Sequence, residues 1–375
     1  MADEKPSSRR EFLRGRSAAR ALLEAARGLA PELPGPSDAA PNSSRPSIRP
    51  PTSADAAHLH ASRRAMACEF AIQYHAADGA YADATLEALD LIGVLEDQLS
   101  IYRDYTEVSA INRTAAEQPV EIEPRLFSLL ELCAWLHATT GGAFDVTSGP
   151  LSRTWGFLKR EGRLPSDDEI AAALENVGFG NVELNAERHT IRFLKPGVEI
   201  NFNSIGKGYA LDRVAELLGE RGVRDYLCHG GRSSVLARGR DRGGDTRGWT
   251  VGVPHPHKPG EHLGEIILRD DALGTSGAGT QFFEGGGQRF GHLIDPRTGW
   301  PTEGVFTATA VASTAAEADA LATAFYINGP GGASEYCAEH MNVGAVLVCP
   351  REGAADDAID VHVFNLDNTR WFPKA

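Results

Sequence analysis

The sequence contains no long apolar run, and no stretch approaches the roughly 18 consecutive apolar residues of a membrane-spanning helix. It is also poor in cysteine, with five in 375 residues, and no two of them form a CxxC pair. We therefore expect neither a disulfide framework nor a structural zinc site. The sequence has no collagen period and no heptad array, which excludes collagen-like and coiled-coil architectures.

Positive charge is also scarce. The 37 Lys and Arg residues are outnumbered by 51 Asp and Glu residues, which leaves a formal net charge of −14. An acidic chain repels nucleic acid, so we do not expect nucleic acid as the main partner. With 42% apolar and 23% charged residues, the chain can form a buried core and is not wholly disordered.

The N-terminal segment differs in composition from the rest of the chain. Residues 1–64 hold 11 basic and 7 acidic residues, and seven of the 21 prolines fall between Pro31 and Pro51. We therefore expect residues 1–60 to form a basic, Pro-rich segment and linker, and residues 61–375 to form the folded domain.

Residues 8–14 of this segment resemble a twin-arginine export signal. Such a signal also needs an apolar core of about 7–15 residues. Residues 15–28 instead predict a short, basic amphipathic helix, because four charged side chains interrupt them. The sequence therefore leaves open whether the protein is exported or stays in the cytoplasm.

The folded part mixes helices and strands without strict alternation, and hairpin-like strand pairs dominate its second half. This pattern predicts a single compact α+β domain with a largely antiparallel sheet and flanking helices. Helices are predicted over residues 81–99, 125–139, 168–176, 206–218 and 315–327. Strands are predicted over residues 66–74, 182–185, 189–194, 198–202, 225–229, 233–238, 249–253, 264–269, 306–312, 343–349 and 359–365.

The helix that begins near Thr314 carries a possible metal site. Thr314 and Glu317 have the spacing of a capping box, so the helix should start there. Asp319 and Thr323 are four residues apart and therefore share one face of the helix. Their oxygens suit a hard cation such as Mg²⁺. The alternative is a solvated Asp319 and a Thr323 that bonds back to its own helix.

Two further segments carry chemistry. Residues 276–299 place His292, a side chain suited to proton transfer near neutral pH, just before an Asp-Pro-x-Thr-Gly turn. Residues 203–212 lead glycine-rich backbone into a helix with Lys207 in its first turn, which can hold a phosphate. Each could instead be a close-packed turn without a ligand.

In this order the segments resemble the FAD:protein FMN transferase (ApbE) family. The resemblance extends over about residues 65–350, and no single motif carries it alone. The matching segments are Met66-Ala67-Cys68, Leu99-Ser100-Ile101-Tyr102 with Ser109 and Asn112, Gly142 to Thr147, Lys207-Gly208 with Asp212, Gly230-Gly231, Thr275-Ser276-Gly277, His292 to Gly299, and Ala318 to Thr323.

The resemblance implies an enzyme that cleaves the FAD pyrophosphate and transfers the FMN half to a threonine hydroxyl of a target protein, with release of AMP. The acceptor would be a redox subunit or another flavoprotein. The family usually works in the cell envelope. A pyrophosphate needs a cation to neutralise its charge, which fits a requirement for Mg²⁺.

The resemblance also implies roles for single residues. Asp319, Thr323 and the backbone carbonyl of Gly206 would hold Mg²⁺. His292 would assist deprotonation of the acceptor threonine, and Asp295 would support that site or the metal. The FAD-binding residues would be Met66, Tyr102, Asp145, Lys207, Gly230, Gly231, Ser276 and Thr298.

Two positions depart from the family pattern. An acidic residue six positions before the Lys-Gly pair is replaced by Asn201, and the acid of a Gly-Gly-Asp motif is replaced by Arg232. Both changes make the local charge more positive. They leave two alternatives to the transferase: a Mg²⁺-dependent FAD pyrophosphatase, or a non-catalytic FAD-binding maturation protein.

Overall fold

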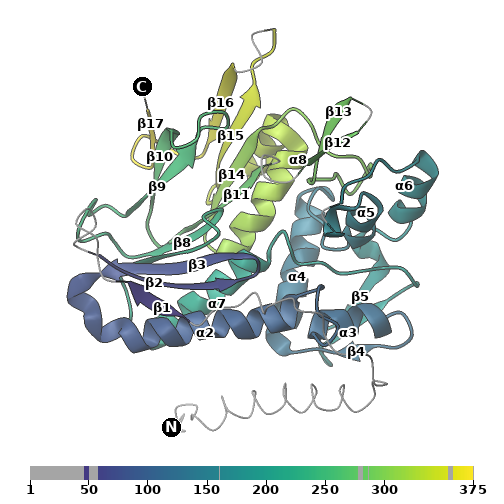
Figure 1. The fold of residues 1–375 in the computed structure, drawn as a ribbon, viewed down its shortest axis with the longest axis horizontal. Helices are drawn as coiled ribbons and strands as arrows, with labels where there is room; N and C mark the ends of the chain where they lie inside the picture. The colour runs from purple at the N-terminus through teal and green to yellow at the C-terminus, as the bar shows by residue number, and fades with distance from the viewer. Residues whose placement is uncertain are drawn as a thin grey trace.

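An antiparallel sheet of nine strands forms the centre of the computed structural model, which describes residues 46–49, 58–159, 161–277, 282–285, 287–353 and 358–374. Every strand pairs with its neighbours in antiparallel fashion (Figure 1). In spatial order the strands are β1 (Ser47–Arg49), β2 (His58–Ala65), β3 (Cys68–His75), β7 (Tyr226–Gly230), β8 (Ser234–Arg238), β11 (Ala272–Gly277), β14 (Thr307–Ala312), β15 (Gly344–Pro350) and β16 (Ile359–Phe364).

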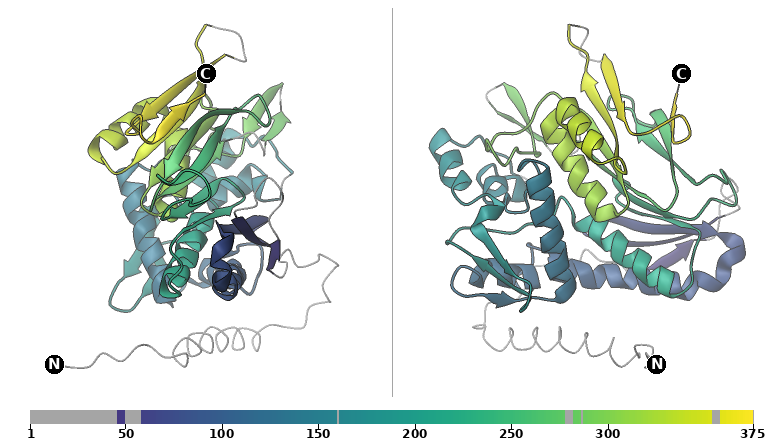
Figure 2. Two further views of the ribbon diagram at one scale, coloured as in Figure 1. Left: turned by 90° about the vertical axis from the view of Figure 1, so that its left-hand side faces the viewer. Right: turned by 180° about the vertical axis from the view of Figure 1, so that it is seen from behind.

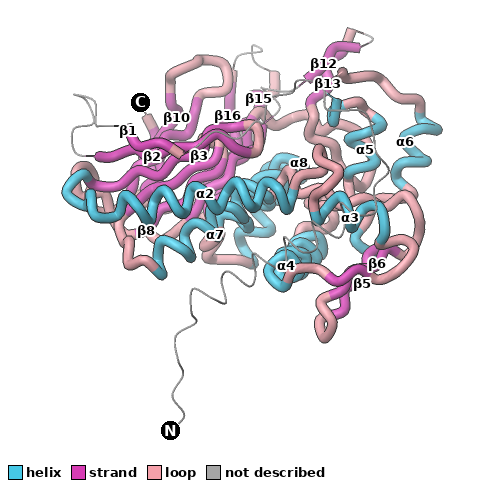
Figure 3. Tube along the Cα trace, turned by 60° about the horizontal axis from the view of Figure 1, so that its bottom comes forward, coloured by secondary structure: helices cyan, strands magenta, loops and turns pink. Residues whose placement is uncertain are grey.

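Three helices cover one face of this sheet: α2 (Ala82–Leu99), α7 (Gly206–Glu220) and α8 (Ala315–Glu339) (Figure 3). Their apolar stripes pack on alternate strand residues and form the largest core cluster, because side chains on one strand face recur every second residue. Gly329, with φ of 67°, breaks the helical path of α8 just before Pro330. No helix in the described ranges is long and apolar enough to cross a bilayer.

A small sheet covers part of the opposite face. It contains β9 (Trp249–Pro254), β10 (His262–Leu268) and β17 (Trp371–Pro373), in the order β17-β10-β9. Its apolar side chains form a second core with residues of β8, β11, β14 and β15. The central sheet is therefore buried on both faces over this half, which explains why β15 is buried at six consecutive positions.

A second block of helices and short strands lies beside the sheet (Figure 2). Its helices are α3 (Glu107–Thr114), α4 (Pro124–Thr139), α5 (Gly149–Thr154) and α6 (Asp167–Leu174), with 3₁₀ turns η2 (Phe157–Lys159) and η3 (Phe179–Asn181); the further turn η1 (Ala76–Tyr81) precedes α2. Strands β4 (Val120–Glu121), β5 (Val182–Asn185) and β6 (Thr190–Phe193) form a three-stranded sheet, and β12 (Phe282–Gly285) pairs with β13 (Gln288–Gly291) in a separate hairpin.

The α+β class with a largely antiparallel sheet is confirmed. The five predicted helices correspond to α2, α4, α6, α7 and the first part of α8. The strand predicted over residues 198–202 is wrong, because this segment is irregular. The Asn112 side chain bonds both the N–H and the carbonyl of Ile200, and the Asn201 N–H donates to the Val146 carbonyl 2.8 Å away. These contacts satisfy the backbone without a neighbouring strand.

The first strands also differ from the prediction. Met66 and Ala67, expected inside a strand, form the turn between β2 and β3. Strand β2 was not predicted, because its buried positions include the small Ala61 and Ala65 rather than large apolar residues. It begins at His58, close to the domain boundary near residue 60, which stays a prediction. The helix predicted over residues 15–28 lies outside the described residues.

Candidate active site

The Asp319 carboxylate lies where α7, α8 and β8 meet. Its side chain is almost fully buried, and its Oδ2 atom accepts hydrogen bonds from the Gly208 N–H at 2.7 Å and the Ser234 hydroxyl at 2.9 Å. Burial raises the pKa of Asp319, while the Lys207 ammonium, the Ser234 hydroxyl and the Gly208 N–H lower it. The carboxylate thus connects three elements that are distant in sequence.

Lys207 brings the positive charge of this site. In the described part of the chain, no side chain or backbone oxygen accepts a hydrogen bond from its ammonium group. The Gly206 N–H donates to the Phe202 carbonyl at 2.7 Å, and the Gly208 N–H is taken by Asp319. The expected cradle of backbone N–H groups is therefore largely occupied, and the ammonium is the group left for an anionic ligand.

Thr323 lies one turn beyond Asp319 on α8, as its spacing predicts. Its hydroxyl donates to the Asp319 carbonyl at 3.3 Å and shares a hydrogen bond of 3.1 Å with the Ser276 hydroxyl on β11. The strand comes this close because Gly274 has no side chain, since a Cβ atom there would lie 2.4 Å from the Ala318 carbonyl oxygen. The structure thus brings together three predicted site residues, Asp319, Thr323 and Ser276.

These oxygen donors fit a hard cation. The possible ligands are the Asp319 carboxylate, the Thr323 hydroxyl and the carbonyl of Gly206, the first residue of α7. The described residues contain no group of three or more His, Cys, Asp or Glu side chains that could hold a metal. Mg²⁺ commonly takes only one or two protein carboxylates and completes its shell with water and substrate phosphates. The donor set therefore suits Mg²⁺ held jointly with a phosphate ligand.

Two strained hairpin turns lie near this crossing of helices. Met66 and Ala67 have φ of 47° and 60°, and Arg232 has φ of 63°, in the left-handed region that side chains disfavour. The β7–β8 turn lies against β3, because the Gly231 N–H donates to the Glu69 carbonyl at 2.8 Å. Strained non-glycine residues often occur at functional sites.

These turns place the predicted residues Met66, Gly230 and Gly231 at one end of the sheet. Gly230 ends β7, and a Cβ atom there would lie 2.7 Å from the Phe70 ring. The Met66 N–H donates to the buried Glu96 carboxylate at 2.9 Å. Ser234, which bonds Asp319, follows the same β7–β8 turn. The turn that carries Arg232 therefore leads directly into the Asp319 site.

Tyr102 lies in the loop after α2 with 62% of its surface exposed. Its hydroxyl accepts a hydrogen bond from the Asn203 side chain at 3.0 Å, and the Asn203 N–H donates to the Asn201 side chain at 2.9 Å. Asn201 and Asn203 precede α7, which begins at Gly206. The exposed Tyr102 ring therefore flanks the loop that leads to Lys207, and Asn201 shapes that loop as a neutral acceptor.

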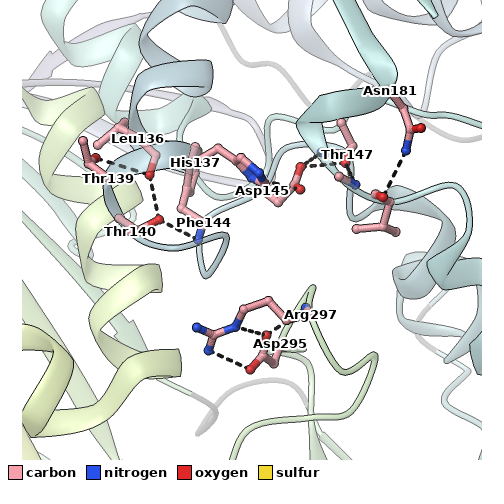
Figure 4. A network of polar contacts seen from close by, with 12 residues as sticks. Leu136, His137, Thr139, Thr140, Phe144, Asp145, Thr147, Asn181, Asp295 and Arg297 are labelled. Carbon is pink, nitrogen blue, oxygen red and sulfur yellow. Dashed lines mark hydrogen bonds and ion pairs between the residues drawn. The ribbon is translucent and has the colours of Figure 1, made fainter. Parts of the chain in front are cut away.

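The predicted residue Asp145 has a different environment. It is 5% exposed, and its Oδ1 atom accepts hydrogen bonds from the Thr147 N–H at 2.7 Å and the Thr147 hydroxyl at 2.6 Å (Figure 4). Its Oδ2 atom lies 3.1 Å from His137 Nδ1, as an ion pair that is not aligned for a hydrogen bond. The Asp145 carboxylate raises the pKa of His137. These contacts order the turn after α4.

Asp295 is held by its own turn. Its Oδ1 atom accepts from the Arg297 N–H and Nε, and its Oδ2 atom accepts from Arg297 Nη2 at 2.8 Å (Figure 4). Arg297 also packs over Gly142, where a Cβ atom would lie 3.5 Å from its Cγ. The exposed Thr298 hydroxyl accepts from the Trp300 N–H at 3.3 Å. The Asp295 turn thus lies against the turn that Asp145 orders.

His292 directly follows β13 and precedes this turn. Its ring meets the edge of Phe157, with 6.5 Å between the ring centroids. A catalytic role for His292 or Asp295 stays a prediction.

Comparison with known proteins shows to which family the chain belongs. A sequence model of the ApbE family matches residues 66–347, which is more than half of the chain. The chain belongs to the ApbE family. The FAD:protein FMN transferase of Haemophilus influenzae is 31% identical over 270 residues, which cover 69% of this chain and 77% of that protein. The enzyme of the same name from Treponema pallidum is 30% identical over 278 residues, which cover 70% of this chain and 76% of that protein.

Solved structures of the ApbE family have the same fold. The ApbE protein of Thermotoga maritima is 28% identical, with a TM-score of 0.71, and the match covers 81% of this chain and 96% of that one. The flavin transferase ApbE of Vibrio cholerae is 25% identical, also with a TM-score of 0.71, and the match covers 82% of this chain and 97% of that one.

The sequence patterns do not reveal the roles of some residues of this ApbE site. Ser234 and Gly208 bond Asp319, and Glu96 holds the Met66 turn. Asp212 was recognised only as part of a motif. Burial raises the pKa of Asp212 to about 7, although two backbone N–H groups of α8 lower it. The sequence carries no signal for the Ser234 contact, because 85 residues separate it from Asp319.

A cavity of about 530 Å³ lies between α4 and α7. Its lining includes Tyr209, Arg213 and Glu216, which share one face of α7. Its lining also includes Asp212, but none of the residues predicted to bind the metal or FAD or to act in catalysis lines it.

Proposed function

We propose that this protein transfers FMN from FAD to a threonine hydroxyl of a target flavoprotein, with release of AMP. The observation that supports this function is the meeting of Asp319, Thr323 and Ser276 beside the Lys207 ammonium. This arrangement occurs in a chain that belongs to the ApbE family, and its relatives are named FAD:protein FMN transferase.

In this proposal Asp319, Thr323 and the Gly206 carbonyl hold Mg²⁺. When bound, the ion neutralises pyrophosphate charge and makes the phosphorus more electrophilic. The buried Asp319 can serve as a ligand because its Oδ1 atom accepts no protein hydrogen bond within the described chain. Lys207 then pairs with a phosphate oxygen as a point charge.

The FAD site extends from these residues along the turns at the end of the sheet. Met66 lines it from the turn between β2 and β3, and Gly230 and Gly231 line it from the end of β7 and the turn that follows. Tyr102 offers an exposed ring for the flavin or adenine, and Ser276 and Thr298 offer hydroxyls. Asp145 supports the site indirectly by ordering the turn after α4, because its Oδ1 atom accepts hydrogen bonds from Thr147 and its Oδ2 atom forms an ion pair with His137. The exposed Arg232 replaces a family acid and adds positive charge beside the pyrophosphate.

His292 accepts the proton of the acceptor threonine in this proposal. The threonine oxygen forms a bond to the phosphorus on the FMN side, and the bond from that phosphorus to the bridging oxygen breaks. AMP leaves with the bridging oxygen. Asp295 holds the turn that follows His292 through its contacts with Arg297.

The test is to incubate purified protein with FAD and Mg²⁺, with and without a protein that carries an exposed threonine in a small-residue segment. We expect AMP release together with covalently bound flavin on the acceptor, and neither product when EDTA removes the metal. AMP without labelled acceptor would instead support the FAD pyrophosphatase. FAD binding without AMP would support a non-catalytic binding protein and would make Asn201 and Arg232 the residues to revert first.

A further inference from the structure

The Asp212 carboxylate on α7 has no ligand role in the proposed reaction, although it is embedded beside the site. Its Oδ1 atom accepts a hydrogen bond from the Ala315 N–H and its Oδ2 atom from the Ala316 N–H, both at 2.8 Å. These N–H groups belong to the first turn of α8, where backbone donors have no partner within their own helix. One side chain of α7 therefore caps another helix.

A second carboxylate makes the reverse contact. Asp319 on α8 accepts a hydrogen bond from the Gly208 N–H on α7 at 2.7 Å. On α7 the contacts are four residues apart, at Gly208 and Asp212, and on α8 they are four apart, at Ala315 and Asp319. Each helix thus donates backbone N–H to a carboxylate of the other helix, and the two sets of contacts are about one helical turn apart.

The crossing leaves no space between the helices. A Cβ atom at Gly208 would lie 2.0 Å from the Ala315 carbonyl oxygen, so the two backbones are in direct contact. A hydrogen-bonded carboxylate on each side of such a contact restrains both rotation and sliding of the helices. Gly206 and Lys207 lie at the start of α7, and Asp319 and Thr323 lie on α8, so their separation depends on this crossing.

We propose that Asp212 is a positioning residue, which holds the first turn of α8 on α7 and thereby sets the distance from Lys207 and the Gly206 carbonyl to Asp319. Its relation to Mg²⁺ and the pyrophosphate rests on the proposed function, whereas its effect on the helix crossing does not.

Thr314 provides the matched control. Its hydroxyl accepts a hydrogen bond from the Glu317 N–H at 3.3 Å, so it caps α8 within the helix itself. Loss of this cap weakens α8 without releasing it from α7. The Thr314→Ala and Asp212→Asn variants should both lower the melting temperature. Only Asp212→Asn should change the crossing, because its amide places a donor against a backbone donor.

The first experiment is hydrogen exchange by mass spectrometry on the full chain. In Asp212→Asn we expect faster exchange in peptides that contain Gly208, whose N–H bonds Asp319, and in peptides that contain Ala315 and Ala316. In Thr314→Ala we expect faster exchange only at the start of α8. Unchanged exchange at Gly208 in Asp212→Asn would overturn the proposal. If Asp212→Asn does not fold, Asp212→Glu keeps the charge and moves it by one methylene.

The second experiment measures Mn²⁺ binding by electron paramagnetic resonance in the presence of ADP, which has a pyrophosphate but no flavin. We expect Asp212→Asn to raise the Mn²⁺ dissociation constant roughly tenfold, the size typical of a residue that orients metal ligands. Thr314→Ala should bind as the wild type does. Equal dissociation constants in all three proteins would refute the link between Asp212 and the metal. A wild type that binds no Mn²⁺ would refute the proposed metal site, while the exchange data would still decide the role of Asp212.

Discussion

The crossing of α7 and α8 differs from the paired turns around Asp145 and Asp295 in how many of its charged side-chain atoms already have a protein partner. At the crossing, Asp212 uses both oxygens, but Asp319 accepts protein hydrogen bonds only at Oδ2 among the described residues, and the Lys207 ammonium donates none. In the paired turns, both oxygens of Asp295 accept hydrogen bonds from Arg297. Asp145 Oδ1 accepts two from Thr147, and its Oδ2 forms an ion pair with His137 without a hydrogen bond. A polar ligand can bind charged atoms that have no protein hydrogen bond, such as Asp319 Oδ1 and the Lys207 ammonium. We therefore place the chemistry at the crossing.

The comparison also shows that a motif residue can serve the site indirectly. The Asp145 and Asp295 carboxylates order neighbouring turns, which touch where Arg297 packs over Gly142. Carboxylates that are held by groups of their own turns in this way fix backbone positions rather than bind substrate. Substitutions at the crossing should therefore affect the reaction more strongly than substitutions in the paired turns.

Asp319→Ala should abolish the reaction, because it removes the only carboxylate of the proposed Mg²⁺ site. Loss of several kcal/mol of charge stabilisation corresponds to a rate reduction of roughly a thousandfold or more. AMP release from FAD at saturating Mg²⁺ measures this effect, with Ser166→Ala, which removes the cap of the distant α6, as the control. Full activity in Asp319→Ala would eliminate our metal assignment.

His292→Ala should reduce transfer to the acceptor by about 10²–10⁴-fold, the usual contribution of a positioned general base. FAD binding, followed by flavin fluorescence, should change little. Asp295→Asn should give a smaller reduction, because it only loosens the turn held by Arg297. If His292→Ala lost FAD affinity and transfer in equal measure, the histidine would be a binding residue instead of a base.

The paired turns should respond to pH through His137. Asp145 raises the pKa of His137 above its usual value of 6.5, so the folded protein holds this proton more tightly than the unfolded chain. This stabilisation is present below pH 6.5 and is lost as the pH rises through the raised pKa. Urea unfolding between pH 6 and pH 8.5 should show a decrease in the free energy of unfolding that His137→Gln reduces. Identical pH profiles for both proteins would contradict the ion pair.

Arg232 should give the smallest effect. Arg232→Gly should stabilise the protein by about 1 kcal/mol, because glycine adopts the left-handed backbone at this turn without strain. Arg232→Asp restores the acid of the family pattern and should raise the KM for FAD severalfold if the arginine pairs with the pyrophosphate. A lower KM in Arg232→Asp would show that the arginine obstructs the FAD site.

Much of the fold follows from local patterns. The helices α2, α4 and α7 begin within one residue of the predicted positions, because their apolar periodicity and the glycines around them are local signals. Strands β11, β12 and β13 are not predicted from the sequence, because they are short and glycine-rich. The segment 198–202 has the composition of a strand, but side-chain and loop contacts take its backbone hydrogen bonds instead.

Three features can be predicted from the sequence alone: the start of α8 at Thr314, the shared face of Asp319 and Thr323, and the family. These features depend on residues within a few positions of each other or on the order of motifs along the chain. Three other features depend on how the fold brings side chains and backbone together. Asp319 bonds Gly208, Asp212 caps α8, and Asp145 is buried against His137. The Asp319–Gly208 and Asp212–Ala315 contacts join residues more than 100 positions apart. They form only because glycine allows two helix backbones to touch, and a local pattern does not reveal which distant backbone will fill that space.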